Sequence, residues 1–419
     1  MSAKIHVSSE IGKLKRVIVH RPDSGIARIS PKRAEELLFD DIVHLPKMQE
    51  EHDIFSSVLK AFLGDENVLE TQHLLKEAIS ADLGKKEWLI DKIIDYEELP
   101  VAFKKLLSDL SDLELATVLI TGYLAREDHI LFDPIPNYIF TRDIAVVVND
   151  QVVITKAAKE ARFRENFLTR FIFWSHPVFA NLEKEGKRIN LNQVDEFPPS
   201  KKGETVSIEG GDMMMLNKDY LLIGRSERTN MHGIHSLQNK LFEKEIVKNV
   251  VEIKIPSDRS FMHLDTLFTQ INKHHIVAFK PIVIDGLSSN VEVHKINGTS
   301  TFYHSIRDFI TNEINPKMEF ILSGNGESPY QEREQWTDGC NLVALKPGVA
   351  LTYDRNPKTE AAFKSFGYSA IHANDFLEDF KKGKINPTQI ENTIINLPST
   401  ELSRGRGGSH CMTCPIERE

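Results

Sequence analysis

The sequence predicts an α+β protein in which similar modules of strand, tight turn, strand and helix form a ring, propeller-like in layout. Two observations favour this fold. A hairpin followed by a helix recurs along much of the 419-residue chain, and one long stretch of helical periodicity interrupts the series. By length alone, two or three domains are plausible.

The repeated unit consists of two short apolar runs that flank a polar turn. In the first copy the turn residues are Asn149 and Asp150, and both types tolerate positive φ. The alternative is an ordinary α+β chain in which hairpins recur by chance, but the matching order of the units favours the ring. The expected elements are a first strand at 16–21, hairpins that pair 145–148 with 152–154, 213–216 with 220–223, 267–271 with 276–279 and 342–345 with 349–353, and helices at 157–173, 235–242 and 359–366.

Residues 49–126 break this pattern. Their apolar residues recur at spacings of three and four, as in the run from Phe55 to Phe62, which is the periodicity of amphipathic helices. The stretch contains almost no cluster of histidine, cysteine or carboxylate with metal-ligand spacing, so its expected role is packing or assembly. We therefore expect an all-helical bundle at 49–126, inserted into a catalytic α/β domain made of residues 1–48 and 127–419.

Composition and charge exclude several classes of protein. Hydrophobic content of 41%, charged content of 27% and a dispersed net charge of −9 are typical of a soluble globular chain and argue against a nucleic-acid or anionic-membrane partner. Three cysteines give no disulfide framework. No apolar signal core and no run of eighteen apolar residues occurs, so we expect a cytoplasmic protein.

The last sixteen residues, 404–419, have the composition of a functional site. Glycines, arginines and a histidine lead into Cys411, and positive charge near a thiol favours its reactive thiolate form. Cys411 and Cys414 could instead be a redox pair or half of a zinc site, although Cys340 is the only other cysteine. The short Arg-Gly run could also be an RNA-binding tail. From the tail alone, a nucleophilic cysteine is about as well supported as these alternatives taken together.

Polar residues stand where several predicted hairpins begin. His263 and Asp265 alternate on the same face of a strand. Each polar residue, taken singly, is most simply a hydrogen-bonding group at a strand end. A metal site of His263, Asp265 and Glu209 is the sharper alternative. If Cys411 enters the same cleft, these groups need no metal. A thiolate could then attack an electron-poor carbon of a cationic substrate that carboxylates hold by paired hydrogen bonds.

Two arginines follow the first two hairpins. Arg162 opens the helix after the first hairpin, and Arg228 follows the second. Each is either a solvated surface charge, which is the usual fate of arginine, or part of a fork that binds a substrate carboxylate.

At these positions the sequence resembles the arginine deiminase family, within the wider group of guanidino-group modifying enzymes. The match runs nearly end to end, and its specificity comes from the order of several short motifs. These are Ser8–Lys15, Glu35–Asp41, Phe140–Asp143, Glu209–Asp212, Met262–Thr266, Arg333–Trp336, Tyr353–Asn356, and Gly405–Gly408 followed by His410–Met412.

The resemblance implies a five-bladed, pentein-like α/β propeller with a helical insertion. It also implies hydrolysis of free L-arginine to L-citrulline and ammonia without cofactor or metal. Cys411 would be the nucleophile, and His263 the general acid and then the general base. The other implied roles are carboxylates that hold the guanidinium (Asp143, Asp265), a partner that orients His263 (Glu209), ligands of the α-carboxylate (Arg162, Arg228), residues lining the amino-acid end (Asn137, Phe140) and a mobile residue at the mouth (Arg406).

Departures from the family pattern fall at the segment 282–297, at Ser403 and Ser409, and at the turn 323–326. They affect the expected shape of the cleft mouth more than the chemistry. Agmatine deiminase or amidinotransferase activity stays open as an alternative, as does a non-catalytic arginine-binding protein on the same scaffold. We expect a homo-oligomer, either a dimer or a tetramer.

Overall fold

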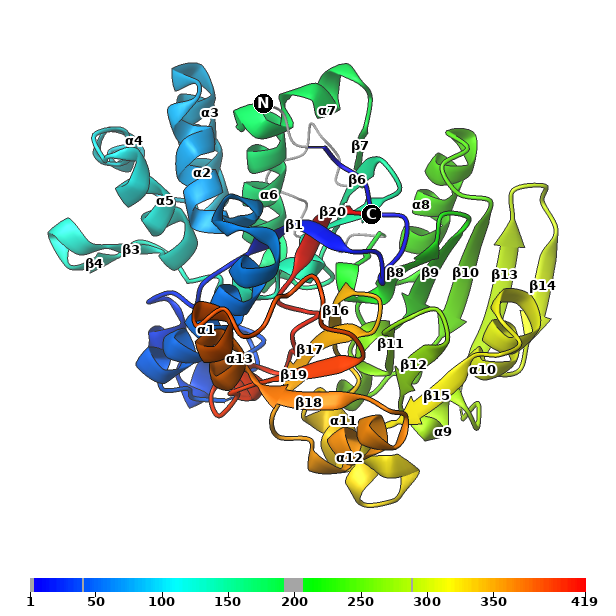
Figure 1. Ribbon diagram of the computed structural model, residues 1–419. Coiled ribbons are helices and arrows are strands. Elements are labelled where there is room, and N and C mark those ends of the chain that lie inside the picture. The colour runs from blue at the N-terminus through cyan, green and yellow to red at the C-terminus, as the bar shows by residue number, and fades with distance from the viewer. Residues whose placement is uncertain (1–3, 40, 192–205, 288) are drawn as a thin grey trace.

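The computed structural model describes residues 4–39, 41–191, 206–287 and 289–419, and shows an α+β chain (Figure 1). Asp40 of the motif Glu35–Asp41 and Ser288 of the segment 282–297 lie outside the described residues. Five sheets share one plan, in which the first strand pairs antiparallel with the second and the second pairs parallel with a third. We call each of these sheets, with its helix, a unit.

The four predicted hairpins form the first two strands of four units. They are β5 (Ala145–Val148) with β6 (Gln151–Ile154), β8 (Met213–Asn217) with β9 (Tyr220–Arg225), β11 (Phe268–Gln270) with β12 (His275–Ala278), and β16 (Val343–Lys346) with β17 (Val349–Tyr353). The parallel third strands are β7 (Arg188–Asn190), β10 (Asn249–Lys254), β15 (Glu319–Leu322) and β19 (Thr393–Leu397).

Both ends of the chain build the fifth unit. β20 (Cys414–Arg418) is its first strand and pairs antiparallel with β1 (Leu14–Val19), which pairs parallel with β2 (Val68–Glu70). The helix α1 (Leu45–Leu63) connects β1 to β2. The N-terminal strand was therefore predicted within two residues, but its partner at the C-terminus was not.

Helices connect the second and third strands of the units. α6 (Phe163–Ser175) begins later than the predicted residue 157, because a 3-10 turn at Glu160–Arg162 comes first. α8 (Met231–Glu243) begins earlier than predicted, since the side chain of Asn230 accepts a hydrogen bond from Gly233 N and caps it. α12 (Pro357–Ser365) has proline at its first position, where the missing N–H costs nothing.

Additional elements extend the units. α7 (Ala180–Lys184) precedes β7, and β13 (Asn290–Lys295) with β14 (Ser300–Tyr303) widens the sheet of β10. The segment 282–297, where the sequence departs from the family pattern, thus contains a strand. The remaining helices and strands of these units are α9 (Lys280–Val283), α10 (Ile306–Phe309), α11 (Tyr330–Trp336), β18 (Ser369–His372) and α13 (Ala373–Lys381).

The strands read as continuous apolar runs because both of their faces are buried. In β5, Ala145 and Val147 join one hydrophobic cluster and Val146 and Val148 join another. Each of five clusters spans two units that follow one another in the chain, and the fifth unit shares one cluster with the fourth and one with the first. Packing therefore connects the units in a cycle.

The helical segment shares these same clusters. α2 (Thr71–Ser80), α3 (Leu83–Tyr96), α4 (Phe103–Ser108) and α5 (Asp112–Thr121) form the group drawn in blue and cyan in Figure 1, beside the short hairpin of β3 (Tyr123–Leu124) and β4 (His129–Ile130). Their apolar side chains pack with the first unit. α1 packs with the fourth and fifth units instead, so the expected boundary at residue 49 lies inside a helix of the fifth unit.

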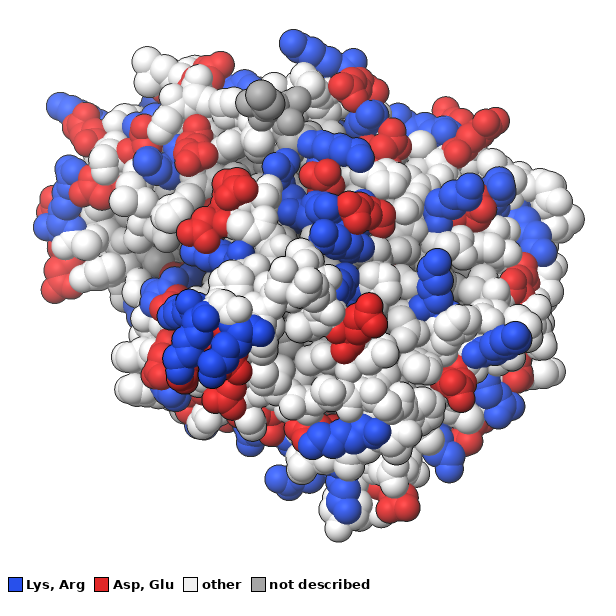
Figure 2. Space-filling view, viewed as in Figure 1, with Lys and Arg blue, Asp and Glu red and all other residues white. Residues whose placement is uncertain are grey.

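Acidic and basic side chains are interspersed on the face shown in Figure 2. Among the residues that the structure describes, none of the helices combines the length and apolarity needed to cross a bilayer.

The fifth unit predicts a large stabilising role for Arg418. Its side chain is 1% exposed and donates hydrogen bonds to the carbonyls of Gly12 at 2.8 Å and Ala344 at 2.7 Å. Arg418→Ala removes these two hydrogen bonds from a charged donor, so we expect the free energy of unfolding to fall by about 2–4 kcal/mol in urea titrations. Lys15→Ala is the control, because Lys15 forms only a half-exposed ion pair with Glu419 and should cost less than about 1 kcal/mol. Equal effects of the two variants would contradict the anchoring role.

Candidate active site

A short turn leads into the first strand of every unit, and these turns carry the predicted site residues. Because the units have the same plan, the turns occupy equivalent positions in the five units. The residues at these entry turns are Asp143 before β5, Glu209 and Asp212 before β8, His263 and Asp265 before β11, Asn341 before β16 and Cys411 before β20.

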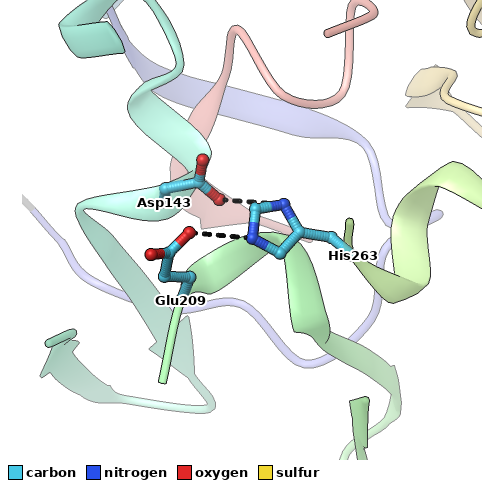
Figure 3. A group of neighbouring side chains, drawn as sticks. All are labelled: Asp143, Glu209 and His263. Atoms are coloured by element: carbon cyan, nitrogen blue, oxygen red, sulfur yellow. Dashed lines mark hydrogen bonds and ion pairs between the residues drawn. The ribbon is translucent and has the colours of Figure 1, made fainter. Parts of the chain in front are cut away.

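His263 lies between two carboxylates (Figure 3). Its Nε2 is 2.9 Å from Glu209 Oε2, and its Nδ1 is 3.7 Å from Asp143 Oδ1. Burial by itself would lower the pKa of His263, but the charge of Asp143 and the hydrogen bond to Glu209 outweigh it and raise that pKa to about 10. The imidazole is therefore protonated near neutral pH and can act as a general acid.

Paired glycines allow this close approach. A Cβ on Gly211 would lie 2.6 Å from His263 Nδ1, and a Cβ on Gly210 would lie 1.9 Å from the carbonyl oxygen of Arg142. No side chain fits at either position. The backbone at Gly211 is therefore packed directly against the imidazole of His263.

The sulfur of Cys411 has a polar but not a cationic environment. Its thiol donates to Asp265 Oδ2 at 3.4 Å, and Asn341 Nδ2 donates to the sulfur at 3.1 Å. Burial raises the pKa of the Cys411 thiol well above its ordinary value, and the nearby carboxylates of Asp265 and Asp143 raise it further. The expectation that the tail supplies positive charge to this sulfur is wrong for the structure.

The tail arginines have other partners. Arg404 pairs with Asp41, with Nε 2.9 Å from Oδ2, and the guanidinium of Arg406 lies over the ring of Trp336 at 3.1 Å from its centroid. Gly407 is packed just as tightly, since a Cβ there would lie 2.4 Å from the ring of Phe140. The tail is therefore a tightly packed loop that fixes the position of Cys411.

A chain of buried groups leads away from Asp265. His410 Nδ1 is 2.8 Å from Asp265 Oδ2, and His410 Nε2 is 3.3 Å from Glu10 Oε2. Glu10 in turn accepts a hydrogen bond from Arg142 Nη2 at 2.6 Å. Burial opposes ionisation of Asp265, but the hydrogen bond and charge of His410 prevail and lower its pKa, so the carboxylate stays ionised.

Arg162 is held by three acids. Its guanidinium lies 2.7 Å from Asp143 Oδ2, 2.8 Å from Glu165 Oε2 and 3.4 Å from Glu209 Oε2. Burial opposes its charge, but these carboxylates raise its pKa well above the ordinary value. Arg162 therefore balances the buried negative charge, which is a role that the sequence did not indicate.

Arg228 has weaker polar contacts than Arg162. Its Nη1 is 3.9 Å from Glu209 Oε1 and its Nη2 contacts the sulfur of Met262, while its buried Nε has no hydrogen-bond partner among the described residues. Of the two predicted carboxylate ligands, Arg228 thus has more capacity for an additional anion.

One cleft of about 620 Å³ collects most of the predicted residues. Glu209 and Asp265 are fully buried beneath it and are not among its lining residues. Asn137 is oriented by its own contacts, because its Nδ2 donates to the carbonyl of Leu37 at 2.7 Å and its carbonyl accepts from Arg162. The predicted residues in the lining are Asn137, Phe140, Asp143, Arg162, Arg228, His263, Arg406 and Cys411.

Asp143, Glu209 and His263 could also hold a metal ion, because their ligand atoms all lie within 4.8 Å of one another. Asp265, which the sequence grouped with His263 and Glu209, does not belong to this set. A cation would have to displace the proton of His263, whose pKa is raised to about 10, and would meet the guanidinium of Arg162. Both charges oppose metal binding.

Sequence reasoning missed Glu10, Glu165, His410 and Asn341. Glu10 and His410 lie inside motifs that were recognised, yet nothing in the sequence pairs two residues so far apart. Asn341 had a usable indication, because it immediately precedes a predicted strand, as Asp143 and Asp265 also nearly do.

Solved structures first define the fold. An amidinotransferase of the saxitoxin pathway from Microseira wollei matches with a TM-score of 0.54 and 14% identity, over 100% of this chain and 98% of that chain. The N-terminal domain of a cyanobacterial arginine dihydrolase matches with a TM-score of 0.51 and 14% identity, over 96% and 97% of the two chains. The chain shares the α+β fold of these proteins.

Sequence comparisons then define the family. The family model of arginine deiminase matches residues 35–128 and 119–418. An arginine deiminase of Limosilactobacillus fermentum is 35% identical over 445 residues, covering 100% of both chains, and one of Listeria monocytogenes serotype 4b is 33% identical over 447 residues, covering 100% of this chain and 99% of its own. The chain belongs to the arginine deiminase family, which confirms the resemblance found in its motifs.

The raised pKa of His263 predicts a pH-dependent stability. The contribution of its charge is fully present below the ordinary histidine pKa of about 6.5. It is lost as the pH rises toward about 10. We expect the excess of wild type over His263→Gln in free energy of unfolding to shrink across this range in urea titrations at a series of pH values.

His232→Gln, at an exposed histidine, is the control and should show no such trend. An excess that grows with pH would mean that His263 is buried in its neutral form.

Proposed function

We propose that this protein hydrolyses free L-arginine to L-citrulline and ammonia. The observation that carries the proposal is the meeting of the Cys411 thiol, the Asp265 carboxylate and the Asp143–His263–Glu209 group at the entry turns of one fold. The relatives named arginine deiminase, aligned over the whole chain, support it. We further propose that the five units close into a five-bladed, pentein-like propeller, because their hydrophobic clusters connect them in a cycle.

We also propose a division of the chain into two domains. We propose a catalytic α/β domain of residues 1–48 and 127–419 with a helical insertion at 49–126. By packing alone, the helical insertion would begin after β2 instead of at residue 49, because α1 packs with the fourth and fifth units. We expect a cytoplasmic homo-oligomer, either a dimer or a tetramer, whose small-molecule partner is L-arginine and not a nucleic acid or a membrane.

The guanidinium of arginine is planar and resonance-stabilised, so it must be held still and approached by a true thiolate. Asp143 and Asp265 provide carboxylates on either side of the reacting group and can pair with its N–H groups. Asp265 Oδ1 is buried and has no hydrogen-bond partner within the described part of the chain, so it can accept a bond from the substrate.

Substrate binding also creates the nucleophile. The carboxylates that hold the guanidinium are those that raise the pKa of Cys411. A bound cation neutralises their field, and the thiol, which lies 3.4 Å from Asp265 Oδ2, can then lose its proton to solvent while Asp265 stays ionised. The thiolate thus forms only when there is a substrate to attack.

Two chemical steps follow. The thiolate forms a C–S bond with the guanidinium carbon, and one C–N bond breaks as the His263 imidazolium gives its proton to the departing nitrogen, which leaves as ammonia. The neutral His263 then takes a proton from water, whose oxygen bonds to the carbon of the thiouronium. The C–S bond breaks, the proton of the new hydroxyl group passes to the departing sulfur, and citrulline and the Cys411 thiol form. Glu209 and Asp143 stabilise the charged imidazole in this cycle.

The other end of the substrate determines specificity. We propose that Arg228, with Arg162, binds the α-carboxylate, and that Asn137 and the backbone near Phe140 line the amino-acid end. Arg406 lies at the mouth of the cleft. Agmatine deiminase activity is disfavoured because agmatine has no carboxylate for these arginines, and a non-catalytic binding protein is disfavoured because the whole reactive set is present.

Turnover by Cys411 is the first test. Purified protein given L-arginine should release citrulline and ammonia in equal amounts, as measured by colorimetric and enzymatic assays. Cys411→Ser should lower kcat by about 10³-fold or more, since a hydroxyl is a far poorer nucleophile than a thiolate. L-arginine binding should persist in that variant by calorimetry.

Two controls separate the competing chemistries. Cys414→Ser removes a buried thiol whose hydrogen bond goes to the carbonyl of Ala145, and it should retain activity. Treatment with EDTA should leave the rate unchanged. Inhibition by the chelator, together with activity in Cys411→Ser, would replace the covalent mechanism with a metal-hydroxide one.

Arg228→Ala tests the recognition of the carboxylate. Loss of hydrogen bonds between charged groups should raise KM for L-arginine by about 10- to 100-fold with a smaller change in kcat, and agmatine should not be affected in this way. Arg225→Ala is the matched control three residues earlier, because Arg225 pairs with Glu252 and does not line the cleft. Unchanged KM for L-arginine in Arg228→Ala would remove the argument for arginine over agmatine.

A further inference from the structure

The entry turn of the fourth unit has no role in the reaction as described so far. Those of the first three units and the fifth supply the acids, the histidine and the cysteine. The turn before β16 places Asn341 in the equivalent position, and its side chain is 1% exposed. A buried amide at such a position must have its polar groups satisfied, so its partners show what it does.

Asn341 contacts Cys411 twice. Its Oδ1 accepts a hydrogen bond from Cys411 N at 3.1 Å, and its Nδ2 donates to Cys411 Sγ at 3.1 Å. The first bond fixes the orientation of the amide, because only the oxygen can accept from a backbone N–H. The NH₂ group must therefore face the sulfur. The same Nδ2 lies 3.2 Å from the carbonyl of Asp265, which fixes its direction further.

The other polar group that contacts the sulfur has the opposite effect. Asp265 Oδ2 can accept a hydrogen bond from the thiol, but it repels a thiolate. Once the proton has left, Asn341 is the neutral donor already in place. We infer that Asn341 is a catalytic residue of the proposed reaction, which aims the Cys411 sulfur and donates the hydrogen bond that stabilises its thiolate.

The backbone of the nucleophile loop is built around the same residue. A Cβ on Gly408 would lie 2.6 Å from the carbonyl oxygen of Asn341, and Ser409 Oγ donates to that oxygen at 3.4 Å. The loop therefore rests partly on the backbone of Asn341, in addition to the hydrogen bond that its side-chain oxygen accepts from Cys411 N. Side-chain variants can then separate aiming of the sulfur from seating of the loop.

Two substitutions separate the two functions of the amide. Asn341→Asp keeps the oxygen that accepts from Cys411 N, but it loses the donor and places a negative charge beside the sulfur. Asn341→Ala loses both contacts. If the donor matters, the Asp variant should be at least as impaired as the Ala variant, with kcat lowered about 10- to 100-fold. If the amide only seats the loop, Ala should be impaired and Asp should be near wild type, and that result would overturn the inference.

A second measurement does not depend on turnover. The rate of Cys411 alkylation by iodoacetamide, followed by peptide mass mapping over a series of pH values, reports the thiolate directly. We expect the Asp variant to need a higher pH than wild type for the same rate. Wild-type alkylation rates in both variants would also overturn the inference.

The control is Asn396→Ala, another buried asparagine, whose Nδ2 bonds to Glu360 far from the cysteine. It should leave kcat and alkylation unchanged. Should Asn341→Asp fail to fold, as judged by thermal melting, Asn341→Ser provides the comparison, because its shorter side chain loses the sulfur contact. If wild type forms no citrulline, the proposed function fails, whereas the alkylation profiles still decide whether Asn341 stabilises the thiolate.

Discussion

The structure depends on the compensation of buried negative charge near the entry turns by buried cations. Asp143, Glu209 and Glu165 converge on Arg162, and the first two also face His263. An isolated carboxylate so deeply buried would either be protonated or would strongly destabilise the folded state. Burial does raise the pKa of Glu165 to about 7, whereas the hydrogen bond to His263 and the charges of Arg162 and Arg228 keep the pKa of Glu209 far below its ordinary value. The cations thus decide which acids remain charged.

The same compensation explains the asymmetry between the histidine and the cysteine. Both are buried beside acids, but the imidazole gains a charge that attracts them and the thiol would gain one that repels them. The pKa of His263 and that of Cys411 are therefore both raised. In the free protein His263 is a protonated acid and Cys411 is an unreactive thiol. A cationic substrate changes the second condition without removing the first. Such a site favours guanidinium compounds before any shape-selective contact is made.

Much of the fold followed from the sequence because hairpins leave local evidence. Apolar runs around turns such as Asn149–Asp150, where Asn149 has φ of 53°, require only neighbouring residues. The fifth unit could not be assembled in this way, since β20 and β1 come from opposite ends of the chain and neither forms a hairpin. The inserted helices were found by periodicity, but periodicity does not show which core a helix covers, and the assignment of α1 depended on that.

The site was predictable to the extent that its residues stand in local motifs. Cys411, His263, Glu209, Asp143 and Asp265 each occupy an entry turn, where polar residues next to an apolar strand are conspicuous.

What the sequence could not supply was the pairing of charges across units. Arg162 looked free to bind a substrate carboxylate, yet Asp143 and Glu209 from two entry turns and Glu165 of α6 surround it. The tail looked cationic, yet its arginines pair with Asp41 and stack on Trp336.

The ring-like order of the packing adds one consequence for how the site is made. Its reactive groups come from entry turns that lie between Asp143 and Cys411 in the chain. No single unit contains both the nucleophile and the general acid. The nucleophile belongs to the unit that needs both chain ends, and that unit shares its hydrophobic clusters with the first and the fourth. The thiol therefore meets the acids and Asn341 only where the units that carry them pack together.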